Sequence, residues 1–213
     1  MEQILWLYHQ PYDPQYPVLC FDERPCFLIG DTVEPIPMNK GKVKKEHYAY
    51  QRNGTCALLA AIEPLTGRRI AKVFDQRRKI EYAQFIQLIV QAYPNAKKIR
   101  IVQDNLNTHT ISSFYHTFEA QQAFEIAQKC EFFFTPKSAS WLNMIEIEFA
   151  ALAKACLHAR IPDKQRLEEQ VMALIKHREE KKIKINWQFS INAAREKMHK
   201  HYKKVNEDNN KYS

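Results

Sequence analysis

The stretch Ile99-Arg-Ile-Val-Gln-Asp104 decides the fold class, because it joins a short apolar run to an acid. Such a run, bounded by polar residues, is typical of a buried strand. Just before it, apolar side chains recur at i, i+3, i+4, i+7 and i+11 from Tyr82 to Tyr93, and Pro94 follows. This spacing predicts an amphipathic helix. A helix that leads into a buried strand favours an α/β fold.

Further strands and helices are predicted on both sides of this unit. The expected strands cover residues 18–21, 55–62, 69–74 and 131–135, and the expected helices cover residues 108–118, 120–129, 141–159 and two segments that start near 162 and 190. This order predicts a mixed five-stranded sheet with helices on both faces. We expect a linker-like lead-in at 1–17, one domain at 18–205 and a polar tail at 206–213.

Composition excludes several classes of function. The 213 residues include only four glycines, which are too scattered for a Walker A loop or a dinucleotide-binding fingerprint. The five cysteines show no CxxC spacing, which argues against a zinc site. Neither a membrane-length apolar run nor a secretory signal is present, so we expect a cytoplasmic protein. The net charge of +8 suggests a polyanionic partner such as nucleic acid.

Two acids follow apolar strands directly. Asp22 comes after Val18-Leu-Cys-Phe21, and Asp104 comes after the run at 99–103. Because α/β sheets place catalytic groups at the carboxyl ends of strands, both acids are candidate site residues. The alternative is that each acid only closes the turn that leaves its strand, since aspartate favours turns.

Glu146 is the third candidate, on the helix expected at 141–159. Its buried stripe is predicted to contain Leu142, Ile145, Phe149, Leu152 and Cys156. Helical spacing places Glu146 at the edge of this stripe and Glu148 nearly opposite it. Glu148 is therefore expected to be exposed and nearly dispensable for activity. An acid turned toward the sheet needs a cation, although Glu146 could instead extend to water. Three converging carboxylates would suit Mg²⁺ or Mn²⁺, with two ions acting in phosphodiester displacement.

The sequence resembles the catalytic domain of bacterial insertion-sequence transposases of the mariner superfamily. The similar motifs are Val18-Leu-Cys-Phe-Asp-Glu23, Val102-Gln-Asp-Asn-Leu-Asn-Thr-His109 and Thr135-Pro-Lys-Ser-Ala-Ser-Trp-Leu-Asn-Met-Ile-Glu146, with 81 and 41 residues between the three acids. The resemblance implies a ribonuclease H-like fold and an Asp-Asp-Glu triad that cuts and joins DNA. That triad corresponds to Asp22, Asp104 and Glu146.

The resemblance also implies partners. Such transposases form a dimeric synaptic complex, insert at a TA dinucleotide and carry helix-turn-helix modules ahead of the catalytic domain. Here only about 20 residues precede Asp22, too few for such a module, since chains below ~40 residues rarely fold alone. We therefore expect a separate or fused N-terminal recognition part, and a protein associated with the nucleoid.

One position departs from the family pattern. Ser138 stands where relatives usually have histidine. This motivates an alternative, a catalytically inactive DNA-binding remnant of the same fold. A second alternative is an unrelated α/β enzyme acting on a small anionic metabolite. The sequence assigns no individual role to Asn105, Asn107 and His109, and His109 could simply close a turn.

Contact with double-stranded DNA is expected from a basic segment with interleaved aromatic residues. Its candidate residues are Lys44, Lys45 and Arg52, joined by Lys137 and Trp141 because these two flank the proposed acids. Cations would meet phosphates, and rings could stack on distorted bases. The alternative for the segment around Lys44 is a solvated basic loop.

Overall fold

The computed structural model describes residues 1–43, 45 and 47–205. Five strands form one sheet: β1 (Val18–Asp31), β2 (Tyr50–Glu63), β3 (Arg68–Phe74), β4 (Ile99–Gln103) and β5 (Cys130–Phe134). The helices are α1 (Glu2–Tyr8), α2 (Lys79–Ala92), α3 (Ser112–Thr117), α4 (Ala120–Lys129), α5 (Ile145–Ala155), α6 (Lys164–Glu180), α7 (Ile191–Lys197) and α8 (His199–Val205), with a 3₁₀ turn η1 (Ser140–Leu142) before α5.

The sheet is mixed, with strand order β3-β2-β1-β4-β5. β1, β2 and β3 are joined by antiparallel pairing, while β1, β4 and β5 pair in parallel. Parallel neighbours need crossover connections, and α2 to α4 supply them. The mixed five-stranded α/β sheet expected from the ribonuclease H-like resemblance is confirmed.

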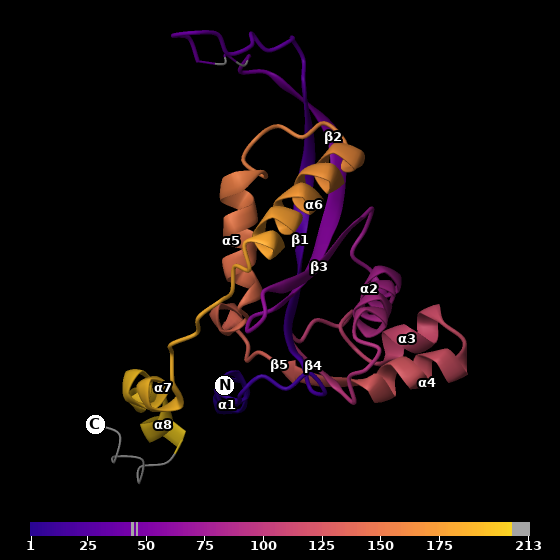
Figure 1. Cartoon of the computed structure of the whole chain (residues 1–213), viewed down its shortest axis with the longest axis vertical. Coiled ribbons are helices and arrows are strands. Elements are labelled where there is room, and N and C mark those ends of the chain that lie inside the picture. The colour runs from indigo at the N-terminus through magenta and orange to yellow at the C-terminus, as the bar shows by residue number, and fades with distance from the viewer. Residues whose placement is uncertain (44, 46, 206–213) are drawn as a thin grey trace.

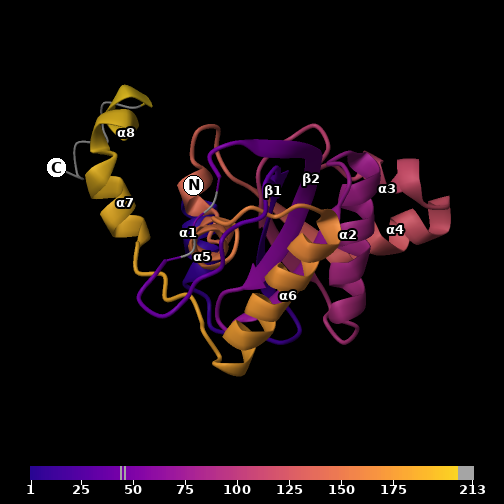
Figure 2. The same ribbon diagram turned by 90° about the horizontal axis from the view of Figure 1, so that it is seen from above.

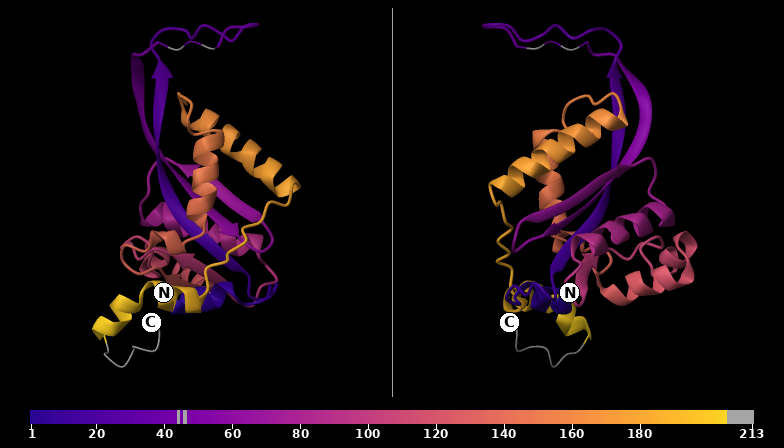
Figure 3. Two further views of the ribbon diagram at one scale, coloured as in Figure 1. Left: turned by 90° about the vertical axis from the view of Figure 1, so that its left-hand side faces the viewer. Right: turned by 45° about the vertical axis from the view of Figure 1, so that its right-hand side comes forward.

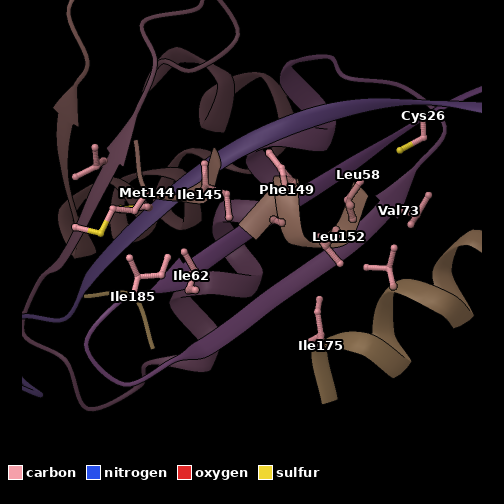
Figure 4. Close-up of a cluster of buried hydrophobic side chains, with 14 of the residues drawn as sticks. Cys26, Leu58, Ile62, Val73, Met144, Ile145, Phe149, Leu152, Ile175 and Ile185 are labelled. Atoms are coloured by element: carbon pink, nitrogen blue, oxygen red, sulfur yellow. The ribbon is translucent and has the colours of Figure 1, made fainter. Parts of the chain in front are cut away.

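Helices cover both faces of the sheet (Figures 1 and 2). Side chains along a strand alternate between faces, so β2 contributes Leu58 and Ile62 to one core and Leu59 to the other. The first core lies under α5 and α6, where Leu152 and Ile175 pack over Leu58 and Val73 (Figure 4). The second core lies under α2, α3 and α4. The prediction of helices on both faces is therefore confirmed.

The first two strands are longer than predicted. β1 and β2 each have 14 residues and pair from Cys20↔Ile62 to Asp31↔Tyr50, well beyond the other strands. The outer ends of β1 and β2, together with residues 32–43, 45 and 47–49, form an arm that projects from the body of the molecule (Figure 1). The prediction that Asp22 ends its strand is wrong: Asp22 is the fifth residue of β1. The polar stretches Asp22-Glu-Arg-Pro25 of β1 and Gln51-Arg-Asn-Gly54 of β2 hid this extension, because they interrupt the apolar runs that predict strands.

The helix expected at 141–159 is interrupted. Its first part is η1, and α5 begins only at Ile145. Asn143 lies at the break, 1% exposed, with its side chain hydrogen bonded to the sheet. The other late helices begin where their caps indicate, because Asp163 and Ser190 each accept a backbone N–H in the first turn.

The expected lead-in contains a packed helix. Ile4, Leu5 and Leu7 of α1 are buried, and the hydroxyl of Tyr8 donates to the carbonyl of Leu142 at 2.7 Å. The interpretation of 1–17 as linker-like stays a prediction, and the polar tail at 206–213 lies outside the described residues. Within the described ranges, no helix is both long and apolar enough to span a membrane.

Candidate active site

The register of β1 and β4 brings the two predicted aspartates to the same level of the sheet. These parallel neighbours pair up to Cys20 opposite Val102, and Asp22 and Asp104 each follow two residues later. At this level β4 ends and β1 continues. Because side chains alternate along a strand, Asp22 shares the face of Cys20, which packs under α5.

Asn143 fixes the start of α5 against this part of β1. Its side-chain amide donates to the carbonyl of Phe21, the residue before Asp22, at 2.8 Å. Its own carbonyl accepts the N–H of Glu146 at 3.1 Å. Glu146 is exposed, so its carboxylate is open to an incoming ligand. Sequence reasoning assigned no role to Asn143, because its partner Phe21 is 122 residues away.

Two of the predicted acids, Asp104 and Glu146, act electrostatically on the third, Asp22. The pKa of Asp22 is raised to about 7, first by burial and then by the negative charges of Asp104 and Glu146, against the opposing effects of the Glu23 N–H and His109. Such a group of like charges favours a bound cation. Across the described ranges, no three histidine, cysteine or acidic side chains are arranged so that they could already hold an ion.

His109 is the histidine that sequence reasoning left without a role. Its ring is 1% exposed, with Nδ1 2.5 Å from Oδ1 of Asp104 and Nε2 3.5 Å from Oε2 of Glu23. The second separation is an ion-pair distance, and Nε2 makes no hydrogen bond. The ring stacks on Tyr82 at a centroid distance of 4.7 Å and meets Phe21 edge-on at 5.3 Å. His109 therefore holds the Asp104 carboxylate from a rigid, buried position.

Two carboxylates keep this histidine charged. Burial alone would lower the pKa of His109, but Asp104 and Glu23 outweigh it and raise the pKa to about 9. The ring is thus an imidazolium at neutral pH. Glu23, next to Asp22, also pairs with Arg77 at 3.6 Å. The Asp-Asn-Leu-Asn-Thr-His motif could have suggested this clamp, but its spacing alone does not show that the histidine turns back onto the aspartate.

The interpretation of Glu148 as an exposed residue is wrong. Glu148 is 2% exposed, and its carboxylate lies between the guanidinium groups of Arg69 and Arg178, with Nε–Oε1 distances of 2.9 Å to each. α5 starts at Ile145, so the buried residues Ile145, Glu148, Phe149 and Leu152 follow i, i+3, i+4 and i+7. Glu146 and Glu148 flank the two sides of this stripe. Arg69 of β3 and Arg178 of α6 cover the side of Glu148, and the side of Glu146 stays open.

Lys137 and Trp141 lie in the loop between β5 and α5. This loop starts beside the site, because the N–H of Thr135 donates to the carbonyl of Gln103, the residue before Asp104, at 2.8 Å. Both side chains are exposed, and Trp141 meets Phe189 edge-on. Ser138 in the same loop is exposed and takes a left-handed backbone, with φ of 62°.

The other predicted DNA contacts lie elsewhere. Arg52 is exposed on β2 and pairs with Ile29, seven residues along β1 from Asp22. Lys45 is exposed farther out on the arm, where it bridges Ile36. Lys44 lies outside the described residues. The structure thus separates Lys45 and Arg52 from the acids.

The fold and site define a class of protein: a mixed α/β domain with an acidic centre where two parallel strands meet a facing helix. Its residues 17–168 match the family of DDE superfamily endonucleases, and the chain belongs to that family. The family membership predicted from the sequence is confirmed at this level.

Among solved structures, the chain is similar to the Mos1 mariner paired-end complex with Mn. The identity is 15% and the TM-score is 0.49. The similarity covers 85% of this chain, which spans 57% of the length of that protein. Comparison with the curated proteins finds no matching sequence.

Proposed function

We propose that this chain is the catalytic domain of a transposase, which cleaves DNA at the ends of a mobile element and joins them to a target with Mg²⁺ or Mn²⁺. The observation that carries the proposal is the register of β1 and β4, which brings Asp22 and Asp104 to the same level beside the start of α5. Membership of the DDE superfamily endonucleases supports the reaction class.

The residues at this centre fit a divalent cation. Carboxylate oxygens are the hard ligands that Mg²⁺ and Mn²⁺ prefer, and Asp22, Asp104 and Glu146 supply them from three elements. Two such ions would activate the attacking water or 3′-hydroxyl and stabilise the leaving oxygen. The effect of Asp104 and Glu146 on the charge of Asp22 supports a cation shared among these positions.

The neighbouring residues hold these ligands in place. His109 keeps the Asp104 carboxylate from rotating, with Glu23 and the Tyr82 ring behind it. Asn143 holds the start of α5 on β1 and so sets the position of Glu146. Lys137 and Trp141 would contact the DNA beside the scissile phosphate, since a lysine meets phosphate and an indole ring stacks on an unpaired base.

The proposal includes partners. Cleavage and joining at two element ends need two catalytic centres, so we propose that the chain works as a homodimer on double-stranded DNA. Recognition of the element ends would come from a helix-turn-helix part, either fused to this domain or a separate chain.

Substitution of Asp104 by asparagine tests the proposal. The amide removes the charge that a cation needs, while its oxygen can still accept the Nδ1–H of His109, so the fold should be retained. We expect metal-dependent cleavage of duplex DNA to fall by more than about a hundredfold, beyond the usual effect of residues that only support metal ligands. Mn²⁺ binding, measured by calorimetry, should fall with it.

Asp75→Asn is the matched control. Its side chain is 81% exposed and pairs with Lys164 on the surface, just after β3, which β2 separates from β1. Cleavage and Mn²⁺ binding should stay at the wild-type level in this variant. Wild-type cleavage by Asp104→Asn would refute the assignment of the centre.

A further inference from the structure

The C-terminal helix pair carries a concentration of positive charge that the proposed centre does not use. Residues 191–205 contain five lysines and arginines and a single acid, Glu196. α8 has no buried residue, so packing does not explain its sequence. Lys200, Lys203 and Lys204 are exposed and follow i, i+3 and i+4, so they share one face of the helix. Within 1–43, 45 and 47–205, none of the three pairs with an acid.

A carboxylate on α1 holds this pair on the body of the protein. Glu2 accepts hydrogen bonds from Nε and Nη2 of Arg195 at 2.8 and 2.7 Å, and from the hydroxyl of Tyr202 at 2.7 Å. Ala194 packs with Leu5 and Leu142 beneath this contact. Glu2 thus binds Arg195 of α7 and Tyr202 of α8, and no ion pair joins it to the lysines of α8 within the described ranges.

The basic helices are continuous with the loop of the proposed centre. Phe189, just before α7, meets Trp141 at a centroid distance of 5.4 Å, and Nζ of Lys197 lies 5.9 Å from the centre of the same Phe189 ring. A run of aromatic and cationic side chains therefore leads from the loop before Glu146 to α8. α7 and α8 lie at the end of the molecule opposite the arm, beside α1 (Figure 3).

We propose that Lys197, Lys200, Lys203 and Lys204 form a second contact surface for the phosphate backbone of double-stranded DNA. This C-terminal surface would hold the duplex that flanks the cleaved bond. The placement beside a cleaved bond rests on the proposed function. Its lysines would not distinguish one DNA sequence from another, because phosphate contacts carry no sequence information. It lies beyond the segment 17–168 that matches the family, so family membership does not assign it.

The composition of the pair favours DNA over a lipid surface. A helix that binds membranes needs a broad apolar face opposite its cations. On α8 the one aliphatic side chain is Val205, at 87% exposure, and the rest are histidine, lysine and tyrosine. Four cations along a short path match the closely spaced charges of a phosphate backbone.

The test replaces Lys200, Lys203 and Lys204 together by glutamine, which keeps helix propensity and removes only charge. Binding to a duplex of about 30 base pairs is followed by fluorescence anisotropy in EDTA, over a salt range of about 50–200 mM. Because three lysines no longer meet phosphates, the slope of log K against log salt should become shallower by about 2 to 3. Affinity at the low-salt end should fall by about tenfold or more. The three side chains are exposed, so the melting temperature should not change.

A triple variant of Lys97, Lys176 and Lys181 to glutamine is the control, since these lysines are also exposed and the loss of charge is equal. It should keep a nearly wild-type slope. Equal losses in both triple variants would overturn the proposal, because net charge alone would then explain binding. The assay needs neither metal nor cleavage, so a chain that fails as a nuclease can still confirm or refute this surface.

Discussion

Glu146 and Glu148 are two positions apart on α5 and have opposite surroundings. Glu146 is exposed at the candidate centre, whereas Glu148 is buried between two guanidinium groups. Arg69 also donates to the carbonyls of Gly67 and Ile183, so one buried cluster joins β3, α5 and the end of α6. A buried charge is tolerated only when its partners remain, which makes Glu148 a structural residue.

Glu148→Gln should therefore destabilise the protein. Loss of the carboxylate leaves two guanidinium groups with less compensation in the core, and breaking a buried ion pair from one side costs about 3–5 kcal/mol. Urea denaturation should show a fall of this order in the free energy of unfolding. Glu146→Gln should keep wild-type stability and lose cleavage. The opposite pattern, with Glu146 needed for stability and Glu148 for cleavage only, would contradict both assignments.

At the scale of elements, local pattern predicted most of the strands and helices but not their contacts. The cap residues Asp163 and Ser190 marked two helix starts, and the apolar runs marked all five strands. The sequence did not reveal which cations would cover Glu148, because Arg69 is 79 residues away and Arg178 is 30 residues away. The packing of α1 was missed for the same reason, since Glu2 meets Arg195 at a separation of 193 residues.

The contact between α1 and α7 should make stability depend on acid pH. The hydrogen bonds from Arg195 hold the pKa of Glu2 at about 2, below its ordinary 4.5. Because this pKa is lower in the folded than in the unfolded protein, the Glu2 carboxylate stabilises the fold at pH values above about 4.5. This stabilisation is lost as the pH falls from about 4.5 toward about 2. Glu2→Gln should cost about 1 kcal/mol at neutral pH, a modest figure because solvent screens this partly exposed pair.

The difference in melting temperature between wild type and Glu2→Gln should shrink as the pH falls below about 4.5. Glu196→Gln, an exposed acid on the same helix pair, serves as the control and should show no such trend. A difference that stays constant down to about pH 3 would mean that the Glu2 carboxylate is not held by Arg195 in solution.

At the scale of the whole molecule, the candidate centre was predictable because it follows from topology. Two acids after two apolar strands were enough to expect Asp22 and Asp104 near each other, whatever the exact strand ends. The two basic surfaces were harder to place. Lys45 and Arg52 were expected to contact DNA without a stated place, and the length of β1 and β2 carries them out along the arm. The polar residues of β2 before Thr55 show no apolar pattern that would reveal this length.

The arm and the C-terminal surface should act on different parts of one long duplex. Arg52 pairs with Ile29, about 23 Å along β1 from Asp22 at a rise of ~3.3 Å per residue. α7 and α8 lie toward the other end of the molecule (Figure 3). We expect a duplex of about 30 base pairs, ~100 Å long, to reach both surfaces, and one of about 10 base pairs, ~34 Å long, to occupy one of them. One variant carries Lys45→Ala and Arg52→Ala, and the other carries the three α8 substitutions. With the long duplex, the binding free energies that the two variants lose should add within about 0.5 kcal/mol, because the sites are remote from each other. With the short duplex, each variant alone should lose little binding, because each short DNA occupies one surface at a time and the other surface remains, whereas the combined variant should lose most of the binding. Titration of both duplexes at the same salt concentration measures this. Additive losses on the short duplex would mean that the arm folds back toward α8 when DNA binds, and the extended arrangement would not describe the complex.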